Sequence, residues 1–192
     1  LRDPISQASV LDFGIDPGKV FLAADACLSD RDIKKVPSDP NAIGMTLIDY
    51  SFRNHDHPEQ AKTNYLAAMR EVADTLLEEN PARHITLFPQ LYGKHSDVPF
   101  LTRFISGLKH PERVAIYPPD NSGPRQQEKI GSMHLMIACR YHSAIFSSKM
   151  NVPCLCVAYE HKAVGFMKML GLEEFVIDIG SINSNAIMER IN

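Results

Sequence analysis

The fold is decided by the stretch Ile137-Ala-Cys-Arg140-Tyr-His142-Ser-Ala-Ile-Phe146. In it, an apolar strand runs into an Arg-x-His pair, and an apolar helix begins directly after the pair. The free N–H groups and the positive end of a helix favour anions, and a guanidinium and an imidazole strengthen that preference. This turn therefore predicts a site for an anionic substrate.

A second apolar run, residues 153–158, follows closely and ends in Tyr159-Glu-His-Lys162. Ligands of open α/β sheets bind outside the carboxyl ends of the strands, so residues that follow parallel strands meet at one edge. We expect Arg140, His142, Tyr159 and Lys162 to surround one cleft there. The side chains of Arg140 and His142 should lie within about 8 Å of each other, because only one residue separates them.

Helical and strand-like patterns alternate along the chain, with short loops between them. Strands are expected at residues 19–24, 42–48, 85–88, 114–117, 135–139, 154–158 and 174–177. Helices are expected at residues 58–79, 98–108, 126–133, 142–149, 162–170 and from about 184, with an exposed loop at 30–41. Such alternation predicts an α/β fold with a doubly wound, mostly parallel sheet and right-handed crossovers.

The composition excludes several classes of protein. With 44% hydrophobic and 22% charged residues and a net charge of -3, the 192-residue chain can form one core and shows no preference for nucleic acid. No apolar stretch reaches the roughly 18 residues that span a bilayer. The four cysteines have no C-x-x-C spacing, and His55-Asp-His57 lacks a third ligand, so we expect reduced thiols, no metal and a cytoplasmic location.

Several motifs, taken in order, resemble those of the polysaccharide pyruvyl transferase family. The most specific are Arg140-Tyr-His142 and Tyr159-Glu-His-Lys162. The other segments that resemble the family are Arg2-Asp-Pro-Ile-Ser6, Asp25-Ala26, Phe88-Pro-Gln90 with Asp97, and the run from Gly165 to Gly171. The resemblance covers nearly the whole chain.

The resemblance implies a domain organisation. Residues 1–192 would form a single Rossmann-like domain, the C-terminal, donor-binding half of a glycosyltransferase-B-like arrangement. Residues 1–18 would be the junction segment, and an N-terminal half-domain would be the missing partner. The isolated chain is then expected to fold but to turn over poorly, because the acceptor would be positioned by the other half.

The resemblance also implies an activity and roles for particular residues. The family transfers the enolpyruvyl group of phosphoenolpyruvate to a sugar of an exopolysaccharide or cell-wall glycan, as a ketal, without a further cofactor. A lipid-linked acceptor would bring the enzyme to the inner face of the membrane. Arg140 would hold the donor and His142 would protonate it, with its pKa lowered by Arg140 and the helix N-terminus while no donor is bound. The further substrate-binding candidates are Tyr159, Lys162, Arg53 and Gln90.

Two other readings of the sequence stay open. A sugar-nucleotide-dependent glycosyltransferase or epimerase half-domain also presents cations at its strand ends, to a diphosphate. A non-catalytic binding module is the other alternative. Binding of phosphoenolpyruvate rather than a nucleotide would favour the transferase, and loss of that binding on Arg140→Ala would count against a mere scaffold.

Overall fold

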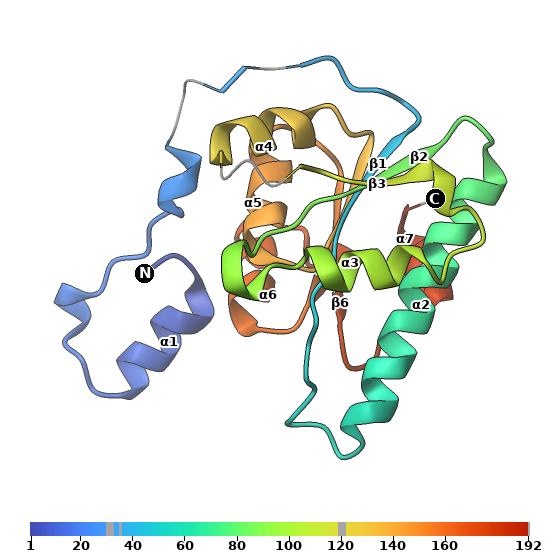
Figure 1. Cartoon of the computed structure of the whole chain (residues 1–192). Helices are drawn as coiled ribbons and strands as arrows, with labels where there is room; N and C mark the ends of the chain where they lie inside the picture. The colour runs from blue at the N-terminus through green and yellow to red at the C-terminus, as the bar shows by residue number, and fades with distance from the viewer. Residues whose placement is uncertain (30–32, 35, 119–121, 192) are drawn as a thin grey trace.

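The computed structural model describes residues 1–29, 33–34, 36–118 and 122–191. Within them, six parallel strands form one sheet in the order β3-β2-β1-β4-β5-β6 (Figure 1). The strands are β1 Ala42–Thr46, β2 His84–Leu87, β3 Val114–Ile116, β4 Leu135–Ala138, β5 Cys154–Ala158 and β6 Val176–Asp178. The predicted doubly wound sheet is confirmed, and its strand order reverses between β1 and β4.

Helices cover both faces of the sheet. The helices are α1 Pro4–Asp12, α2 Pro58–Glu79, α3 Val98–Ile105, α4 Gly123–Gly131, α5 Tyr141–Lys149, α6 His161–Met169 and α7 Ser184–Ile191. Side chains of α2, α3 and α7 share one core with Ile137 and Cys139 of the central strand region. Side chains of α4, α5 and α6 share the second core with Met136 and Ala138. Successive side chains of β4 thus point into opposite cores, as expected of a strand that is buried on both faces.

Helix α2 shows how directly the sequence specifies some elements. Its observed bounds match the predicted range 58–79, with Pro58 at the first helical turn. Tyr65, Met69, Val72 and Leu76 recur at helical spacing and are almost completely buried. The apolar stripe packs against the sheet while the opposite face carries the charged residues.

At the centre of the sheet, Gly44 of β1 is needed for packing. It pairs with Thr86 and Met136 on the neighbouring strands. A Cβ atom added to Gly44 would lie 2.0 Å from the Met136 sulfur. The methionine side chain fills the space over the glycine, so a larger residue here would displace it.

The strand predicted at residues 19–24 does not form. Pro17–Lys19 is a 3₁₀ turn, and the residues after it are extended without belonging to the sheet. Phe21 remains 72% exposed. A short apolar run becomes a strand only where a sheet edge is free to pair with it, and this segment lies away from the sheet (Figure 1).

Residues 1–28 form an N-terminal arm that projects from the body beside α6 (Figure 1). Helix α1 within it lay in the predicted junction segment. Asp3 caps this helix through the Ser6 N–H, and Pro4 occupies its first turn, which are the usual signals of a helix start. Residues 33–34 and 36–41 of the predicted loop contain no helix or strand, while 30–32 and 35 lie outside the described residues.

Candidate active site at the carboxyl edge of the sheet

Arg140 lies two residues beyond the end of β4 and stands at the N-cap of α5. Its Nη2 atom lies 2.6 Å from Oδ1 of Asp97, and its side chain is 14% exposed. The Nε–H of Arg140 is buried and has no hydrogen-bond partner. Because a buried donor without a partner is costly, this guanidinium is suited to receive an oxygen from a bound anion.

Asp97 holds Arg140 in place and also organises the loop that follows β2. Its Oδ2 accepts hydrogen bonds from the backbone N–H groups of Gln90 and Leu91, at 2.8 and 2.9 Å. The side chain of Gln90 donates to Gln126 Oε1 at 2.7 Å. The structure therefore places Gln90 beside the Arg140–Asp97 pair, with its amide bonded to α4.

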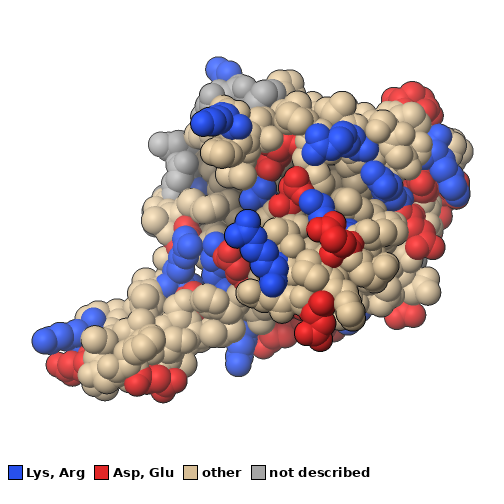
Figure 2. Space-filling view, turned by 60° about the horizontal axis from the view of Figure 1, so that its bottom comes forward, with Lys and Arg blue, Asp and Glu red and all other residues tan. Residues whose placement is uncertain are grey.

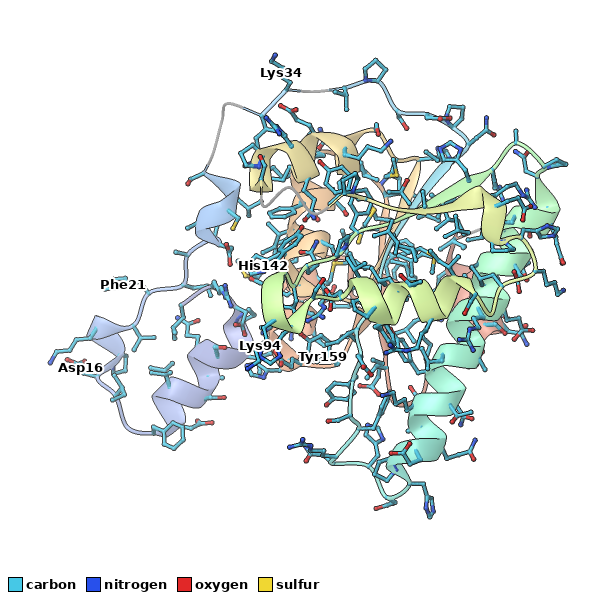
Figure 3. All side chains as sticks on the ribbon, in the orientation of Figure 1. Asp16, Phe21, Lys34, Lys94, His142 and Tyr159 are labelled. Atoms are coloured by element: carbon cyan, nitrogen blue, oxygen red, sulfur yellow. The ribbon has the colours of Figure 1, made fainter. Side chains whose placement is uncertain are left out.

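His142 lies exposed on the first turn of α5, on the side of the body that faces the arm (Figure 3). Neighbouring atoms partly desolvate the imidazole, which disfavours its charged form and lowers its pKa. The charges of Arg2 and Lys162 act in the same direction, and Asp25 opposes them. The pKa is lowered, as expected. Burial is the largest cause, and the contributing cations are Arg2 and Lys162 in place of the expected Arg140.

Arg2 is a site residue that the sequence analysis missed. The arm brings its Nη1 to 2.7 Å from Oδ2 of Asp25, while 43% of the Arg2 side chain remains exposed. Its guanidinium carbon lies 4.6 Å from the ring centroid of Tyr141, whose hydroxyl donates to the same Asp25 oxygen at 3.3 Å. Arg2 opens the quoted Arg2-Asp-Pro-Ile-Ser6 segment, so the signal was present but was assigned to the junction.

The end of β5 contributes the other predicted residues. The Nζ atom of Lys162 lies 2.5 Å from Glu160 Oε2 and 6.0 Å from the ring centroid of Tyr141. The ring of Tyr159 contacts that of Tyr50, with the centroids 5.3 Å apart. Lys162 and Arg2 thus both approach the Tyr141 ring and line the same hollow. Tyr159 instead joins an aromatic group that follows β1.

Arg53 follows this aromatic group in the loop between β1 and α2, and its side chain is exposed. The residue before it, Phe52, adopts a positive φ of 51° and is fully buried. The buried Phe52 anchors a loop whose next residue turns into solvent. The structure therefore places Arg53 in the loop beyond the carboxyl end of β1, and no hydrogen bond or ion pair joins it to the other described candidates.

Two hollows flank the carboxyl edge. One, of about 570 Å³, lies between the arm and α6 and is lined by Arg2, Asp3, Ser6, Asp25, His161 and Lys162 among others. The other, of about 300 Å³, is lined by residues that include Ile48, Asp49, His95, Asp97, Arg103 and Arg140. Arg140 and Lys162 line separate hollows, and Lys and Arg side chains gather where the arm joins the body (Figure 2).

Metal ligation and thiol chemistry find little support in the part of the chain that the structure describes. No group of three or more His, Cys, Asp or Glu side chains there is placed to hold a metal ion. The described cysteines are free thiols, and burial raises the pKa of Cys139 and of Cys156 to about 12, so neither forms a thiolate near neutral pH. Among the described helices, none has the length and apolar character needed to cross a bilayer.

The fold is that of a Rossmann-like α/β domain, and cationic side chains lie at the carboxyl edge of its sheet. The chain belongs to the polysaccharide pyruvyl transferase family, whose model matches residues 1–161. It is 40% identical to the amylovoran biosynthesis protein AmsJ of Erwinia amylovora over 63 residues, which make up 33% of this chain and 15% of AmsJ.

Solved structures share the fold. The UDP-GlcNAc 2-epimerase of Methanocaldococcus jannaschii superposes with a TM-score of 0.62 at 13% identity, over 99% of this chain and 53% of the epimerase. A putative UDP-N-acetylglucosamine 2-epimerase of Listeria monocytogenes gives 0.58 at 16% identity, over 98% and 48%. Staphylococcus aureus TarM gives 0.51 at 11%, over 100% and 40%. This chain thus spans about half the length of the two epimerases.

Proposed function

We propose that this chain binds phosphoenolpyruvate at the carboxyl edge of its sheet and takes part in transferring the enolpyruvyl group to a sugar, as a ketal. The observation that carries the proposal is Arg140. Its guanidinium sits at a helix N-terminus with a buried, unpaired Nε–H. Arg2 and Lys162 add positive charge around His142, on the same first turn of α5. A carboxylate or phosphate oxygen is the ligand that these groups favour.

The reaction needs a proton at the methylene carbon of the donor. His142 is the candidate donor of that proton, and protonation leaves an oxocarbenium-like centre at the carbon that bears the phosphate. A sugar hydroxyl attacks this centre and loses its proton. A second hydroxyl then attacks the same carbon as its bond to the phosphate oxygen breaks. The proton of this hydroxyl passes to the departing phosphate, and inorganic phosphate leaves as the ketal closes. Arg140 holds the donor anion, and the positive charges of Arg2 and Lys162 around His142 favour the negative charge that develops on the leaving phosphate.

His142 must be cationic in the donor complex for this role. Without donor its pKa lies below the ordinary value, so the imidazole is neutral at pH 7. The negative charges of the arriving donor favour the protonated form and raise the pKa again. Transfer should therefore fall as pH rises through the pKa of His142 in the donor complex.

Replacement of His142 by glutamine tests its role. Glutamine keeps a hydrogen bond but cannot supply an acidic proton, so kcat should fall roughly 10²-fold or more. The affinity for phosphoenolpyruvate should change much less. If His142→Gln retains its turnover and loses only donor affinity, His142 is a binding residue and the acid lies elsewhere.

Replacement of Arg140 by alanine tests the anion site itself. Direct titration with phosphoenolpyruvate should show a Kd raised roughly 10²-fold, the cost of removing one partner from a buried, hydrogen-bonded charge pair. Arg83→Ala is a matched control, since Arg83 pairs with Glu79 at the far end of α2. Equal losses in both variants, or binding of a UDP-sugar in place of phosphoenolpyruvate, would contradict the proposal and favour a sugar-nucleotide enzyme.

We further infer that the chain is the donor-binding half of a two-domain enzyme. The share of the epimerase structures that it spans, about half, supports this division. The acceptor would be a saccharide, carried on a lipid, that the second half positions. The isolated chain should then bind the donor but form ketal slowly, and rapid ketal formation by residues 1–192 alone would count against the division.

A further inference from the structure

The N-terminal arm exposes large apolar side chains. Phe13 is 85% exposed and Phe21 72% exposed, and α1 has no fully buried residue. The other apolar side chains exposed on the arm are Leu1, Leu11, Ile15 and Leu22. Single exposed apolar residues are common, but a set of them on one projecting segment marks an interaction surface.

The arm is nonetheless anchored to the body. The backbone N–H of Ala23 donates to the Leu1 carbonyl at 2.8 Å, which closes the arm into a loop. Asp3 packs so tightly on α6 that a Cβ atom at Gly165 would lie 2.7 Å from the Asp3 Cβ. Arg2 and Asp25 hold the arm against Tyr141, beside His142. The apolar side chains therefore stand on an attached segment at the carboxyl edge of the sheet.

The charge of the arm argues against an anionic lipid surface as its partner. Residues 1–28 contain two cationic side chains, Arg2 and Lys19, and four carboxylates, Asp3, Asp12, Asp16 and Asp25, a side-chain balance of 2 - 4 = -2. Peripheral proteins approach anionic membranes with the opposite sign of charge. The mostly uncharged surface of the arm, with its charges near the tip (Figure 2), fits an apolar protein surface better.

We propose that the apolar surface of the arm, comprising Leu11, Phe13, Ile15, Phe21 and Leu22, is the docking surface for a second α/β domain of the same polypeptide. The proposal rests on the division into two halves inferred above. A domain that covers this surface stands over the carboxyl edge and faces Arg140 and His142. The arm thus links the binding of that domain to the position of Arg2, because one segment carries both.

Hydroxyl-radical footprinting read by mass spectrometry tests the proposal without any donor or turnover. In residues 1–192 alone, Phe13 and Phe21 should be oxidised readily. In the natural polypeptide that carries this sequence, their oxidation should fall about fivefold or more, as expected of side chains in the core of an interface. Met169 and Leu170, exposed near the end of α6, are the internal controls and should be oxidised equally in both.

The double variant Phe13→Ser, Phe21→Ser separates docking from folding. It should raise the oxidation of Leu11 and Leu22 in the natural polypeptide while the unfolding midpoint of residues 1–192 stays the same. Met169→Ser should leave both quantities unchanged. Unprotected Phe13 and Phe21 in the natural polypeptide would overturn the proposal.

Two further outcomes would overturn it in favour of another partner. Protection that appears in residues 1–192 alone, rises with concentration and accompanies a doubled mass would identify a second copy of this chain. Protection only on phosphatidylglycerol vesicles would identify a membrane. Normal donor binding with an unprotected arm would refute the docking surface while leaving the proposed anion site intact.

Discussion

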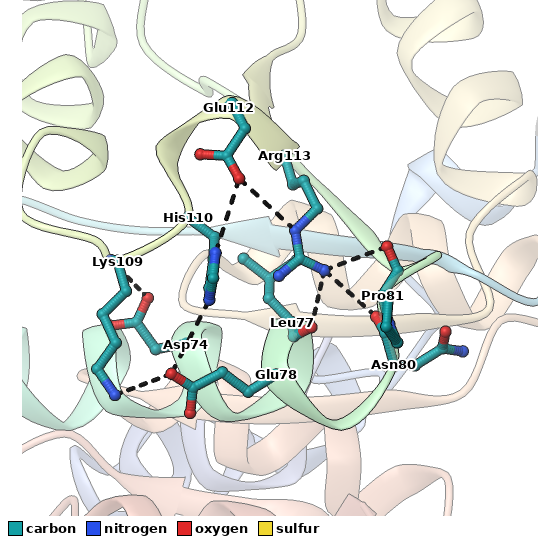
Figure 4. Close-up of polar contacts among 9 residues, drawn as sticks. All are labelled: Asp74, Leu77, Glu78, Asn80, Pro81, Lys109, His110, Glu112 and Arg113. Atoms are coloured by element: carbon teal, nitrogen blue, oxygen red, sulfur yellow. Dashed lines mark hydrogen bonds and ion pairs between the residues drawn. The ribbon is translucent and has the colours of Figure 1, made fainter.

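Two arginines with carboxylate neighbours illustrate different uses of the same chemistry. Arg113, beside β3, donates from Nη1 to the carbonyls of Leu77, Asn80 and Pro81 at 2.7, 3.3 and 3.3 Å (Figure 4). Its Nε lies 3.9 Å from a carboxylate oxygen of Glu112. Arg140 instead makes one ion pair, with Asp97, and its Nε–H has no partner.

The difference lies in how the donors are used. Arg113 satisfies carbonyls at and just beyond the carboxyl end of α2, groups that a helix leaves without intrahelical partners. An exposed network of ion pairs near the surface leads to it, from Lys109 through Glu78 and His110 to Glu112 (Figure 4). Density of charge therefore does not define an anion site; a cation with unused donors beside a hollow does.

An unpaired donor is informative only where a ligand can reach it. Arg70 also has a buried Nε–H without a partner. A Cβ atom added to Gly107 would lie 2.7 Å from that nitrogen, so the backbone of Gly107 covers it. Arg70 lines a hollow of about 220 Å³ beside α2 and α3. Arg140 lines a separate hollow of about 300 Å³ and stands at the N-terminus of α5, where the helix itself favours an anion.

The largest effect is expected from Asp97→Ala. Asp97 is 5% exposed and receives Arg140 and two backbone N–H groups, so its removal leaves a buried cation and buried donors without a partner. Urea unfolding should show a loss of about 3–5 kcal/mol in the free energy of unfolding. Glu112→Ala, in the exposed network, should change it by less than about 1 kcal/mol. Similar losses in both variants would show that the buried Arg140–Asp97 pair is no more important for stability than the exposed network.

Arg113→Ala should have a smaller effect and of a different kind. It leaves carbonyls at the end of α2 without their donor and should lower the free energy of unfolding by about 1–3 kcal/mol. Binding of phosphoenolpyruvate should not change. If calorimetric titration shows Arg113→Ala weakening the donor as much as Arg140→Ala does, the distinction between cap and site is wrong.

Acid should act first on the arm, with the smallest effect on overall stability. Burial alone would raise the pKa of Asp25, but hydrogen bonds from the Cys27 N–H and from Arg2 outweigh it and hold the pKa below its ordinary value of 3.8. The pKa of Asp3 is likewise lowered, by hydrogen bonds from Ser6 that outweigh its burial. A lowered carboxylate pKa stabilises the fold above the unfolded-state value and loses that contribution as pH falls through the folded-state value.

Below pH 3.8, therefore, hydrogen exchange should reveal release of the arm before the sheet opens. Asp25→Asn should release the arm at neutral pH, because it removes the charge that pairs with Arg2. The amides of α2 serve as the internal reference. Protection of the arm that persists through acid, or a sheet that opens at the same pH, would show that these carboxylates do not anchor it.

Much of this molecule follows from local pattern. The spacing in residues 58–79 predicts α2 with its observed bounds, and the run from Ile137 to Phe146 predicts β4, the turn and α5. The alternation of elements is sufficient for the parallel sheet because right-handed crossovers leave few other topologies. Residues 19–24 do not form the predicted strand because they have no neighbouring strand to pair with, whereas the six strands of the sheet do.

The sequence by itself determined the α/β class, the carboxyl edge at which Arg140 and His142 stand, and the motifs that mark the family, because each depends on residues close together in the chain. Only the tertiary structure decided which partners those residues have. Asp97 and Arg140 are 43 residues apart in the sequence and form an ion pair. Arg2, at the N-terminus, contacts the ring of Tyr141. Such pairings depend on how helices and loops pack, which no local period encodes, and they determine which cations remain available to a ligand.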